Sequence, residues 1–267
     1  MSESGVGPGW HPIEWGAEFA GTALLLLGGL SAVVLDFGHG SPVAAILPDR
    51  SARLLLTGIL FGGTGSLVAI SPLGRLSGAH LNPAVTLAFW IAGHVHSRDL
   101  AGYWIAQVLG GLLGAVMVAL VWTSRASSVR DGMTLPAPGL SRLGAAGIEA
   151  LMTALLILTI FAFTARHRTM RWTPLAVWVL IAILVWVGAP FTGASLNPTR
   201  SLGPAVVERS FDSIWVYFAG PLLGAAAAAG LSRAVGGRLA PLTAKLFHDW
   251  DYPSVFKKHP APPPATN

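Results

Sequence analysis

GAHLNPA at residues 78–84 and GASLNPTR at residues 193–200 are two copies of one motif, Gly-Ala-x-Leu-Asn-Pro. Asn is a preferred N-cap because its side chain accepts from free backbone N–H groups, and Pro suits the first helical position, where no N–H is needed. Each copy therefore predicts a helix that begins at its Asn-Pro pair. Two such starts, at matching places in strongly apolar sequence, indicate a pore or transport site near the middle of a bilayer.

The composition is that of a membrane protein. Of 267 residues, 53% are hydrophobic and 11% are charged, and the mean hydropathy is +0.62; about 25% of residues are charged in soluble domains. The chain has no Cys, which excludes disulfides, thiolate metal sites and Cys nucleophiles. The net charge is +5, but the basic residues lie between apolar runs, so we expect topology signals and no nucleic-acid partner. The N-terminus lacks the basic start of a cleaved signal peptide.

Apolar segment lengths predict the architecture. A helix needs about 20 apolar residues to cross a bilayer, and six segments reach that length: 15–36, 52–71, 100–123, 144–165, 172–191 and 212–234. Two shorter segments, 82–92 and 197–207, follow the motifs and would reach only about 15 Å, half the hydrocarbon core. The expected fold is an all-α membrane protein with six transmembrane helices and two re-entrant half-helices that meet near the middle.

The two halves of the chain repeat. Glu-x-x-x-Thr occurs at 18–22 and again at 149–153, and each half has the order span, span, half-helix, span. An odd number of spans per repeat means that the second copy is inverted in the membrane. We expect five parts: an N-terminal segment 1–14, a first repeat 15–123, an extramembrane loop 124–142, a second repeat 143–235 and a Pro-rich tail 236–267.

Charge predicts the orientation weakly. If both termini are cytoplasmic, ten of the 17 Lys and Arg residues lie inside and seven lie outside, as the positive-inside rule requires. The tail contributes much of this bias, and from about Ala240 it is expected to be poorly ordered. The short run His94, His96 and Arg98 is expected to lie in a solvated loop and not to bind metal.

At this point the chain resembles the aquaporins, or major intrinsic proteins. SGAHLNPAVT at 77–86 and GASLNPTRS at 193–201 resemble the two signature loops of that family, and residues 17–22 resemble its first-helix signature. The resemblance covers about residues 15–235. It implies a passive channel for water or small uncharged solutes that excludes ions and protons, in a plasma or inner membrane. It further implies a homotetramer with one pore per subunit, no enzymatic activity, no cofactor and no metal.

The resemblance also implies roles for particular residues. The two motifs would face each other at the midplane, through Asn82, Pro83 and Ala84 and through Asn197, Pro198 and Thr199. Arg200 would form the outer constriction, and Glu18 and Glu149 would brace the two re-entrant loops. Backbone carbonyls would form an acceptor ladder beside the pore, at Gly78, Ala79, His80, Gly193 and Ser195.

The remaining constriction positions indicate which solutes could pass. The family's spacing places Gly62, Val185 and Ala194 opposite Arg200, which predicts a wide and largely apolar passage for glycerol, urea or an undissociated metalloid acid. A shift of one residue would instead bring Phe61 or Trp186 to the constriction. Ser201 and the Tyr217-Phe218 pair resemble the water-selective members. Thr199 replaces the usual Ala and adds a hydroxyl and a branch near the midplane.

Two other classes of function remain open from the residues alone. An ion- or proton-coupled transporter also uses inverted repeats and half-helices, and it would need Glu18 or Glu149 as a coupling group. A non-conducting structural member of the family is the second alternative, and Thr199 supports it.

Overall fold

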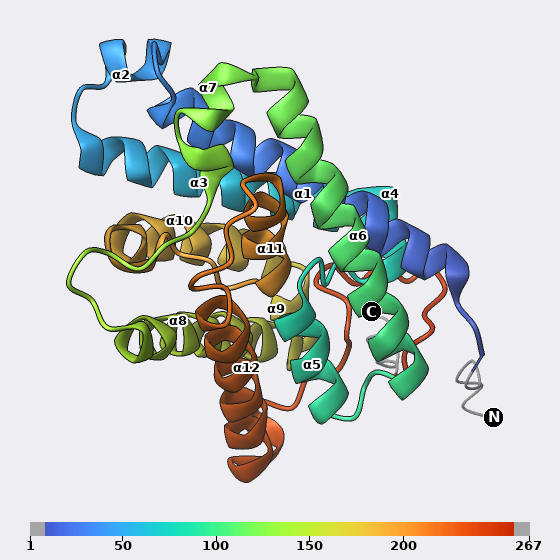
Figure 1. Ribbon diagram of the computed structural model, residues 1–267. Helices are drawn as coiled ribbons and strands as arrows, with labels where there is room; N and C mark the ends of the chain where they lie inside the picture. The colour runs from blue at the N-terminus through green and yellow to red at the C-terminus, as the bar shows by residue number, and fades with distance from the viewer. Residues whose placement is uncertain (1–8, 259–267) are drawn as a thin grey trace, which may run out of the picture.

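The structure is a computed structural model that describes residues 9–258 (Figure 1). Six long helices match the six predicted spans: α1 (Pro12–Phe37), α3 (Arg50–Ile70), α6 (Ser97–Trp122), α8 (Arg142–Thr164), α10 (Thr173–Thr192) and α12 (Val216–Ala234). All except α12 have the length and mean hydropathy, 1.6 to 2.3, of a membrane span. α12 is 19 residues long, and Arg233, Pro221 and its Gly residues lower its mean hydropathy.

Shorter helices fill the connections. The half-helices are α5 (Pro83–Ile91) and α11 (Pro198–Val207), close to the predicted ranges. The remaining helices are α2 (Pro42–Ile46), α4 (Pro72–Ser77), α7 (Ser124–Ser127), α9 (His167–Met170) and two 3-10 turns, η1 (Arg130–Gly132) and η2 (Gly236–Arg238).

Helix packing follows the internal repeat. α1 packs on α3 and α6, and in the second half α8 packs in the same way on α10 and α12. Each half-helix packs on the last span of the other repeat, α5 on α12 and α11 on α6, while α3 and α10 close the remaining side. This exchange brings the two half-helices together in the middle of the molecule.

The second repeat runs in the opposite direction to the first. We call the side that carries the C-terminal residues the tail face. α1 begins there, since Glu14 in its first turn lies close enough to Lys245 to act on its charge. α8 ends there, since the carbonyl of Thr164 accepts from the backbone N–H of Leu242 at 2.9 Å. The corresponding helices of the two repeats are therefore antiparallel.

Glycines set the spacing of the paired helices. Gly110 and Gly114 bring α6 against α1, and Gly220 and Gly224 bring α12 against α8. A Cβ added at any of these four positions would collide with a carbonyl oxygen of the facing helix, at Phe19, Ala23, Ala146 or Ala150. Their small-xxx-small spacing thus allows close backbone approach, as it does in other membrane proteins.

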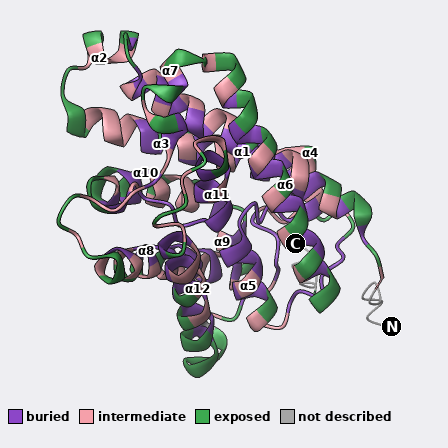
Figure 2. Cartoon of the chain, in the orientation of Figure 1, coloured by how far each residue is buried: buried purple, intermediate pink, exposed green. Residues whose placement is uncertain are grey.

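The outer surface is apolar. Leu109 and Leu120 of α6, Leu151 of α8 and Val179 of α10 are all more than half exposed. Figure 2 shows that buried residues gather on the inner sides of the helices and around α5 and α11. A polar interior with an apolar exterior is what a bilayer requires, because only interior polar groups can find partners there.

Residues 240–257, which we call the C-terminal segment, differ from the sequence expectation of a poorly ordered tail. Figure 1 shows the segment, in red, running back from the end of α12 toward α4, α5 and α6. Its backbone N–H groups bond to carbonyls of the tail face: Leu242 to Thr164 at 2.9 Å, Leu246 to Gly78 at 3.0 Å and Lys257 to His94 at 2.9 Å. These acceptors are backbone carbonyls at helix ends and in loops, which have no partner within a helix. Amino-acid composition gives no indication of them. The prolines at 260–264 lie outside the described residues.

Candidate functional site

Both half-helices begin at the predicted caps. The Oδ1 atom of Asn82 accepts from the N–H of Ala84 at 2.8 Å, and Oδ1 of Asn197 accepts from the N–H of Thr199 at 3.0 Å. Pro83 and Pro198 occupy the first helical positions. The positive ends of both helices therefore lie in the interior, and each asparagine keeps its NH2 group for other partners.

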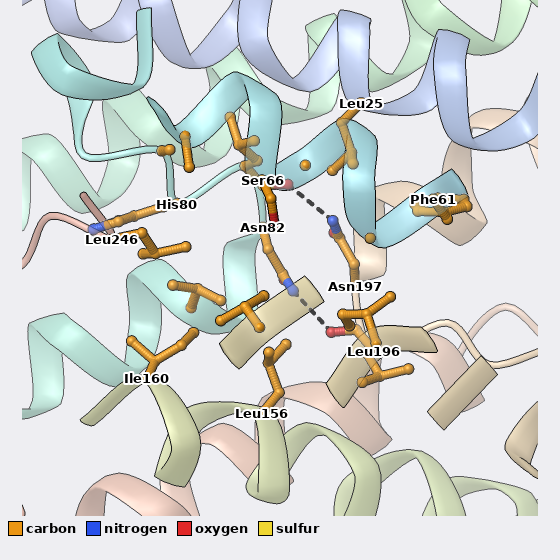
Figure 3. A pocket seen from close by; sticks show the side chains of 18 of the residues that line it. Leu25, Phe61, Ser66, His80, Asn82, Leu156, Ile160, Leu196, Asn197 and Leu246 are labelled. Atoms are coloured by element: carbon orange, nitrogen blue, oxygen red, sulfur yellow. Dashed lines mark hydrogen bonds between the residues drawn. The ribbon is translucent and has the colours of Figure 1, made fainter. Parts of the chain in front are cut away.

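The two asparagines tie the repeats together. Asn82 Nδ2 donates to the carbonyl of Leu196 at 2.9 Å, and Asn197 Nδ2 donates to the carbonyl of Leu81 at 2.9 Å. Figure 3 draws both bonds, with the two side chains next to each other in one pocket. Each bond uses one of the two amide hydrogens, which leaves the second for a molecule in that pocket.

The loops before the asparagines share one unusual backbone conformation. The φ angle is positive at Gly78 and at Ala79 and Leu81, and again at Gly193 and at Ala194 and Leu196. Positive φ at a residue other than Gly costs on the order of 1–3 kcal/mol and persists only where the surroundings enforce it. The alternation turns successive carbonyl and N–H groups to different sides of each loop.

Glu18 supplies this enforcement in the first repeat. Its carboxylate accepts from the N–H groups of His80 at 3.0 Å and Leu81 at 2.7 Å. It also accepts from Ser77 Oγ and Gln107 Nε2, both at 2.7 Å, and it is fully buried. Four donors satisfy the buried charge and fix the loop.

Glu149 does the same in the second repeat. It accepts from the N–H groups of Ser195 at 2.9 Å and Leu196 at 2.8 Å, and from Thr192 Oγ1 at 2.6 Å. The two carboxylates thus hold equivalent loop positions.

Sequence reasoning assigned no framework role to four residues that the structure places here. Ser77 and Thr192 stand five positions before each asparagine, and their hydroxyls also accept from Ala79 and Ala194. Tyr103 and Tyr217 donate to the carbonyls of Ser77 and Thr192 at 2.7 and 2.8 Å. The shared offset of Ser77 and Thr192 is a signal that the repeat could have revealed.

Two cavities lie between the repeats. The inner cavity, about 100 Å³, reaches toward the tail face and is lined by both asparagines, His80 and Leu246. The outer cavity, about 190 Å³, is lined by Gly132, Val185 and Ala194 among others. Five residues line both cavities and lie where the two adjoin, the place where we expect the constriction: Phe61, Ile181, Ser195, Leu196 and Arg200.

Arg200 is the charged member of the constriction and is only 6% exposed. Its Nη1 donates to the carbonyl of Gly132 at 2.7 Å, and its guanidinium carbon lies 5.5 Å from the centre of the Phe61 ring. The Phe61 ring in turn packs against Gly29 of α1. The structure thus pairs a buried cation with an aromatic ring where the two cavities adjoin.

The other predicted constriction residues are arranged as follows. Val185 and Ala194 line the outer cavity, and Gly62 lines the inner cavity. Gly62 also packs against α10, since an added Cβ would lie 3.0 Å from the carbonyl oxygen of Trp178. Phe61, the alternative left open by the sequence, is the neighbour of Arg200, whereas Trp186 is exposed and bonds to Ser51.

Four of the five residues expected to contribute carbonyls line the cavities. Ala79, His80, Gly193 and Ser195 line one cavity or the other. Gly78 is not among the described lining residues, and its carbonyl accepts from the N–H of Leu246.

The loop that holds Arg200 carries a titratable pair. Burial, together with the neighbouring carboxyl of Glu208, raises the pKa of Asp131 to about 6. Asp131 is therefore mostly ionised at pH 7. Within residues 9–258, no cluster of three or more His, Asp or Glu side chains is arranged to hold a metal ion.

The amino-acid sequence is similar to those of known membrane proteins. A family model described as "Major intrinsic protein" matches residues 13–231. The lens fiber major intrinsic protein of Gallus gallus is 37% identical over 240 residues, which is 85% of each chain. Aquaporin NIP1-1 of Zea mays is 34% identical over 215 residues, which is 80% of this chain and 71% of the relative.

A solved structure has a similar fold. The aquaglyceroporin from Plasmodium falciparum superposes with a TM-score of 0.69, covering 84% of this chain and 96% of that one. The two sequences are 21% identical, so this likeness concerns the fold alone.

Proposed function

Because this chain belongs to the major intrinsic protein family and is a membrane channel for water and small solutes, we propose that it passes glycerol and urea as well as water. One observation carries this proposal: the constriction sets a buried guanidinium opposite an aromatic and aliphatic wall. In such a passage the guanidinium can donate hydrogen bonds to the hydroxyl groups of a solute, while the apolar wall contacts its carbon atoms.

Hydrogen bonding along the path replaces the bonds that a permeant loses on leaving bulk water. Asn82 and Asn197 line the inner cavity and would offer amide hydrogens there. The loops at His80 and Ser195 also line it, and we expect their backbone carbonyls to accept from the permeant. The facing wall is aliphatic, with Leu156 and Ile160 of α8. A site with few partners holds a solute only loosely, as conduction requires.

Selectivity for larger neutral solutes rests on the constriction. Phe61 and Ile181 face Arg200, and Val185 and Ala194 extend the apolar lining outward. Glycerol carries three hydroxyls on one edge of a short chain, and urea is flat and polar. Both match a slot with donors on one side only. An undissociated metalloid acid belongs to the same class of neutral, hydroxyl-rich solutes.

Ions and protons are excluded by charge. Each half-helix places roughly +0.5 elementary charge at its N-terminus, and both N-termini lie at the two asparagines. Arg200 adds a full positive charge at the constriction, so a cation or a hopping proton meets a barrier twice. The carbonyl oxygens on the wall repel anions.

The coupled-transporter alternative is not favoured. Glu18 and Glu149 each accept from two loop N–H groups and from hydroxyl or amide side chains. A carboxylate with this set of donors braces backbone, whereas a coupling group needs to exchange protons with the transport path.

Stopped-flow light scattering on proteoliposomes tests the proposal. Purified protein would be challenged with sorbitol, glycerol and urea gradients, and empty liposomes would give the background. We expect fast shrinkage with sorbitol, and fast reswelling with glycerol and urea. Water flux with background rates for both glycerol and urea would contradict the wide passage. Arg200→Val should raise proton leak, measured with an entrapped pH dye, while water flux continues.

Assembly and orientation complete the proposal. We infer a homotetramer with one pore per subunit, supported by family membership, and both termini on the cytoplasmic side of a plasma or inner membrane. Cross-linking in membranes should stop at four subunits. Protease added to right-side-out vesicles should leave a C-terminal tag intact.

A further inference from the structure

The C-terminal segment lies across one end of the pore, and Leu246 is its residue in the inner cavity. We propose that Leu246 is a further permeation-determining residue, which the C-terminal segment holds across the tail-side mouth and withdraws when the segment is released. This inference rests on the proposed function.

Leu246 occupies the end of the path. Figure 3 shows Leu246 beside His80 at one end of the inner cavity, Phe61 at the other, and the two asparagines between them. The side chain of Leu246 is 7% exposed, so it is packed into the mouth and not turned to solvent. A permeant that leaves Asn82 toward the tail face meets an apolar group with no hydrogen-bonding capacity.

The same residue removes an acceptor from the ladder. The N–H of Leu246 donates to the carbonyl of Gly78 at 3.0 Å, so this oxygen is bound to protein and not offered to a permeant. Ala79 and His80, the next residues of the loop, line the inner cavity. The segment therefore closes the mouth in two ways. The side chain of Leu246 fills space there, and its N–H occupies the carbonyl of Gly78.

His80 joins the segment to the re-entrant loop. Its Nε2 is 2.8 Å from the carbonyl oxygen of Ala244, and its Nδ1 is 3.2 Å from Thr86 Oγ1. Its ring stacks between Phe89 of α5 and Phe256 of the segment, with centroid distances of 4.9 and 5.4 Å. His80 thus both lines the inner cavity and contacts the C-terminal segment.

Lys245 provides a second anchor. It is fully buried, and its Nζ donates to the carbonyls of Arg75 at 2.6 Å and Pro253 at 2.7 Å. Arg75 also pairs with Asp249 of the segment at 3.0 Å. A lysine buried among carbonyls folds the segment back on itself and fixes it to α4.

A glycine pair provides a place for movement. Gly236 and Gly237 join α12 to the C-terminal segment, and a Cβ added at either would meet open space. Gly236 has φ +67, which glycine adopts without strain. The segment can therefore change direction at this joint while α12 stays in place.

Deletion of residues 240–267 is the primary test, and a chain lacking only 259–267 is the matched control. If the docked form outnumbers the released form about ten to one, the deletion raises water permeability per protein about tenfold. The control should match the full chain. Leu246→Ala keeps every backbone bond of the segment, and we expect it to raise permeability at least about threefold. Leu242→Ala, in the same segment but outside the described lining of the inner cavity, should leave permeability unchanged.

A reversible lock tests the closed state without a deletion. The chain has no Cys, so His94→Cys with Lys257→Cys creates a single pair, at residues whose backbones are joined by a 2.9 Å hydrogen bond. Backbones this close are compatible with disulfide geometry. The oxidised double variant lacks the released form, so it should conduct less than the full chain and therefore more than about tenfold less than the deleted chain. Reduction should restore the permeability of the full chain. Each single variant is a control.

The outcomes separate this inference from the proposed function. Equal water permeability in the full, deleted and oxidised proteins would overturn the role of Leu246 and leave the channel intact. A deleted chain that elutes as a folded protein and passes no water would overturn both.

Discussion

The methyl group of Thr199 packs against Gly111 of α6, so closely that a Cβ added to Gly111 would overlap it. Thr199 is not among the described residues that line either cavity. The branch that distinguishes this half-helix from its partner is thus accommodated by a glycine in the neighbouring span. The midplane of the pore is left to the two asparagines.

This contact predicts a matched pair of effects. Gly111→Ala should destabilise the protein by about 1–3 kcal/mol, because overpacking a tight contact forces side chains or backbone to move. The additional Thr199→Ala change removes the obstructing methyl and should restore most of the loss. Thermal unfolding in detergent, followed by tryptophan fluorescence, measures both.

Gly147→Ala is the control for this cycle, since a Cβ at this exposed position of α8 meets nothing within 4 Å. We expect no loss there, and a gain of about 0.5–1 kcal/mol from the higher helix propensity of Ala. Additive losses at Gly111 and Thr199, with no rescue, would show that the two residues do not interact.

The bracing carboxylates give a second prediction. Glu18→Gln and Glu149→Gln each turn an amide NH2 toward a group that already donates, so at least one buried N–H of a re-entrant loop loses its acceptor. The expected cost is about 1–3 kcal/mol per lost bond, together with reduced water permeability. Thermal unfolding and stopped-flow scattering on the same preparations report both.

Asp212→Asn, on the exposed surface, is the matched carboxylate control and should change neither quantity. If the two glutamates were instead coupling groups, their substitution would leave stability intact while abolishing pH-dependent transport.

Phe61 gives a third prediction. Phe61→Ala removes the ring that faces Arg200, so glycerol and urea permeability should rise several-fold, more than water permeability does. Phe163→Ala, in a groove on the outer surface between α8 and α10, is the matched control. Equal ratios of glycerol to water flux in the two variants would place the constriction elsewhere.

The fold was largely predictable, and the constriction was not. The capping residues Asn82 and Asn197 predict where the half-helices begin, and the lengths of the apolar segments predict the spans. Each predicted span therefore lies close to a helix of the structure. Phe61 and Gly62 differ by one helical position, or about 100° of rotation, and no property of the single sequence fixes that angle. The docking of residues 240–257 depends on backbone hydrogen bonds, which leave little trace in the identity of side chains.

Lys245 gives a prediction for pH. Burial lowers the pKa of Lys245 from 10.5 to about 8, although the charges of Asp249 and Glu14 oppose the shift. Below pH 8 the amine is protonated whether the segment is docked or released, so docking bears the full cost of burying the charge. Between pH 8 and 10.5 the docked amine is neutral while the released amine binds a proton, so rising pH disfavours release.

Water permeability of the full chain should therefore fall as pH rises from 8 toward 10, by up to about tenfold per pH unit once release limits the flux. Lys245→Met has no titrating amine at this position and should lose the dependence. A full chain whose permeability rises over this interval would reverse the assigned sign. The deleted chain is the control for the lipid and for the other titrating groups.

The exchange of hydrogen bonds between Asn82 and Leu196 and between Asn197 and Leu81 has a consequence for direction. A half-turn about an axis through that point interchanges the repeats, so a molecule there encounters the same donors whichever way it travels. The two asparagines therefore do not distinguish the direction in which a molecule crosses the centre of the pore. Any difference between the two directions must therefore come from the ends of the path. On our proposal, these are the Phe61 ring over Arg200 on one side and the C-terminal segment on the other.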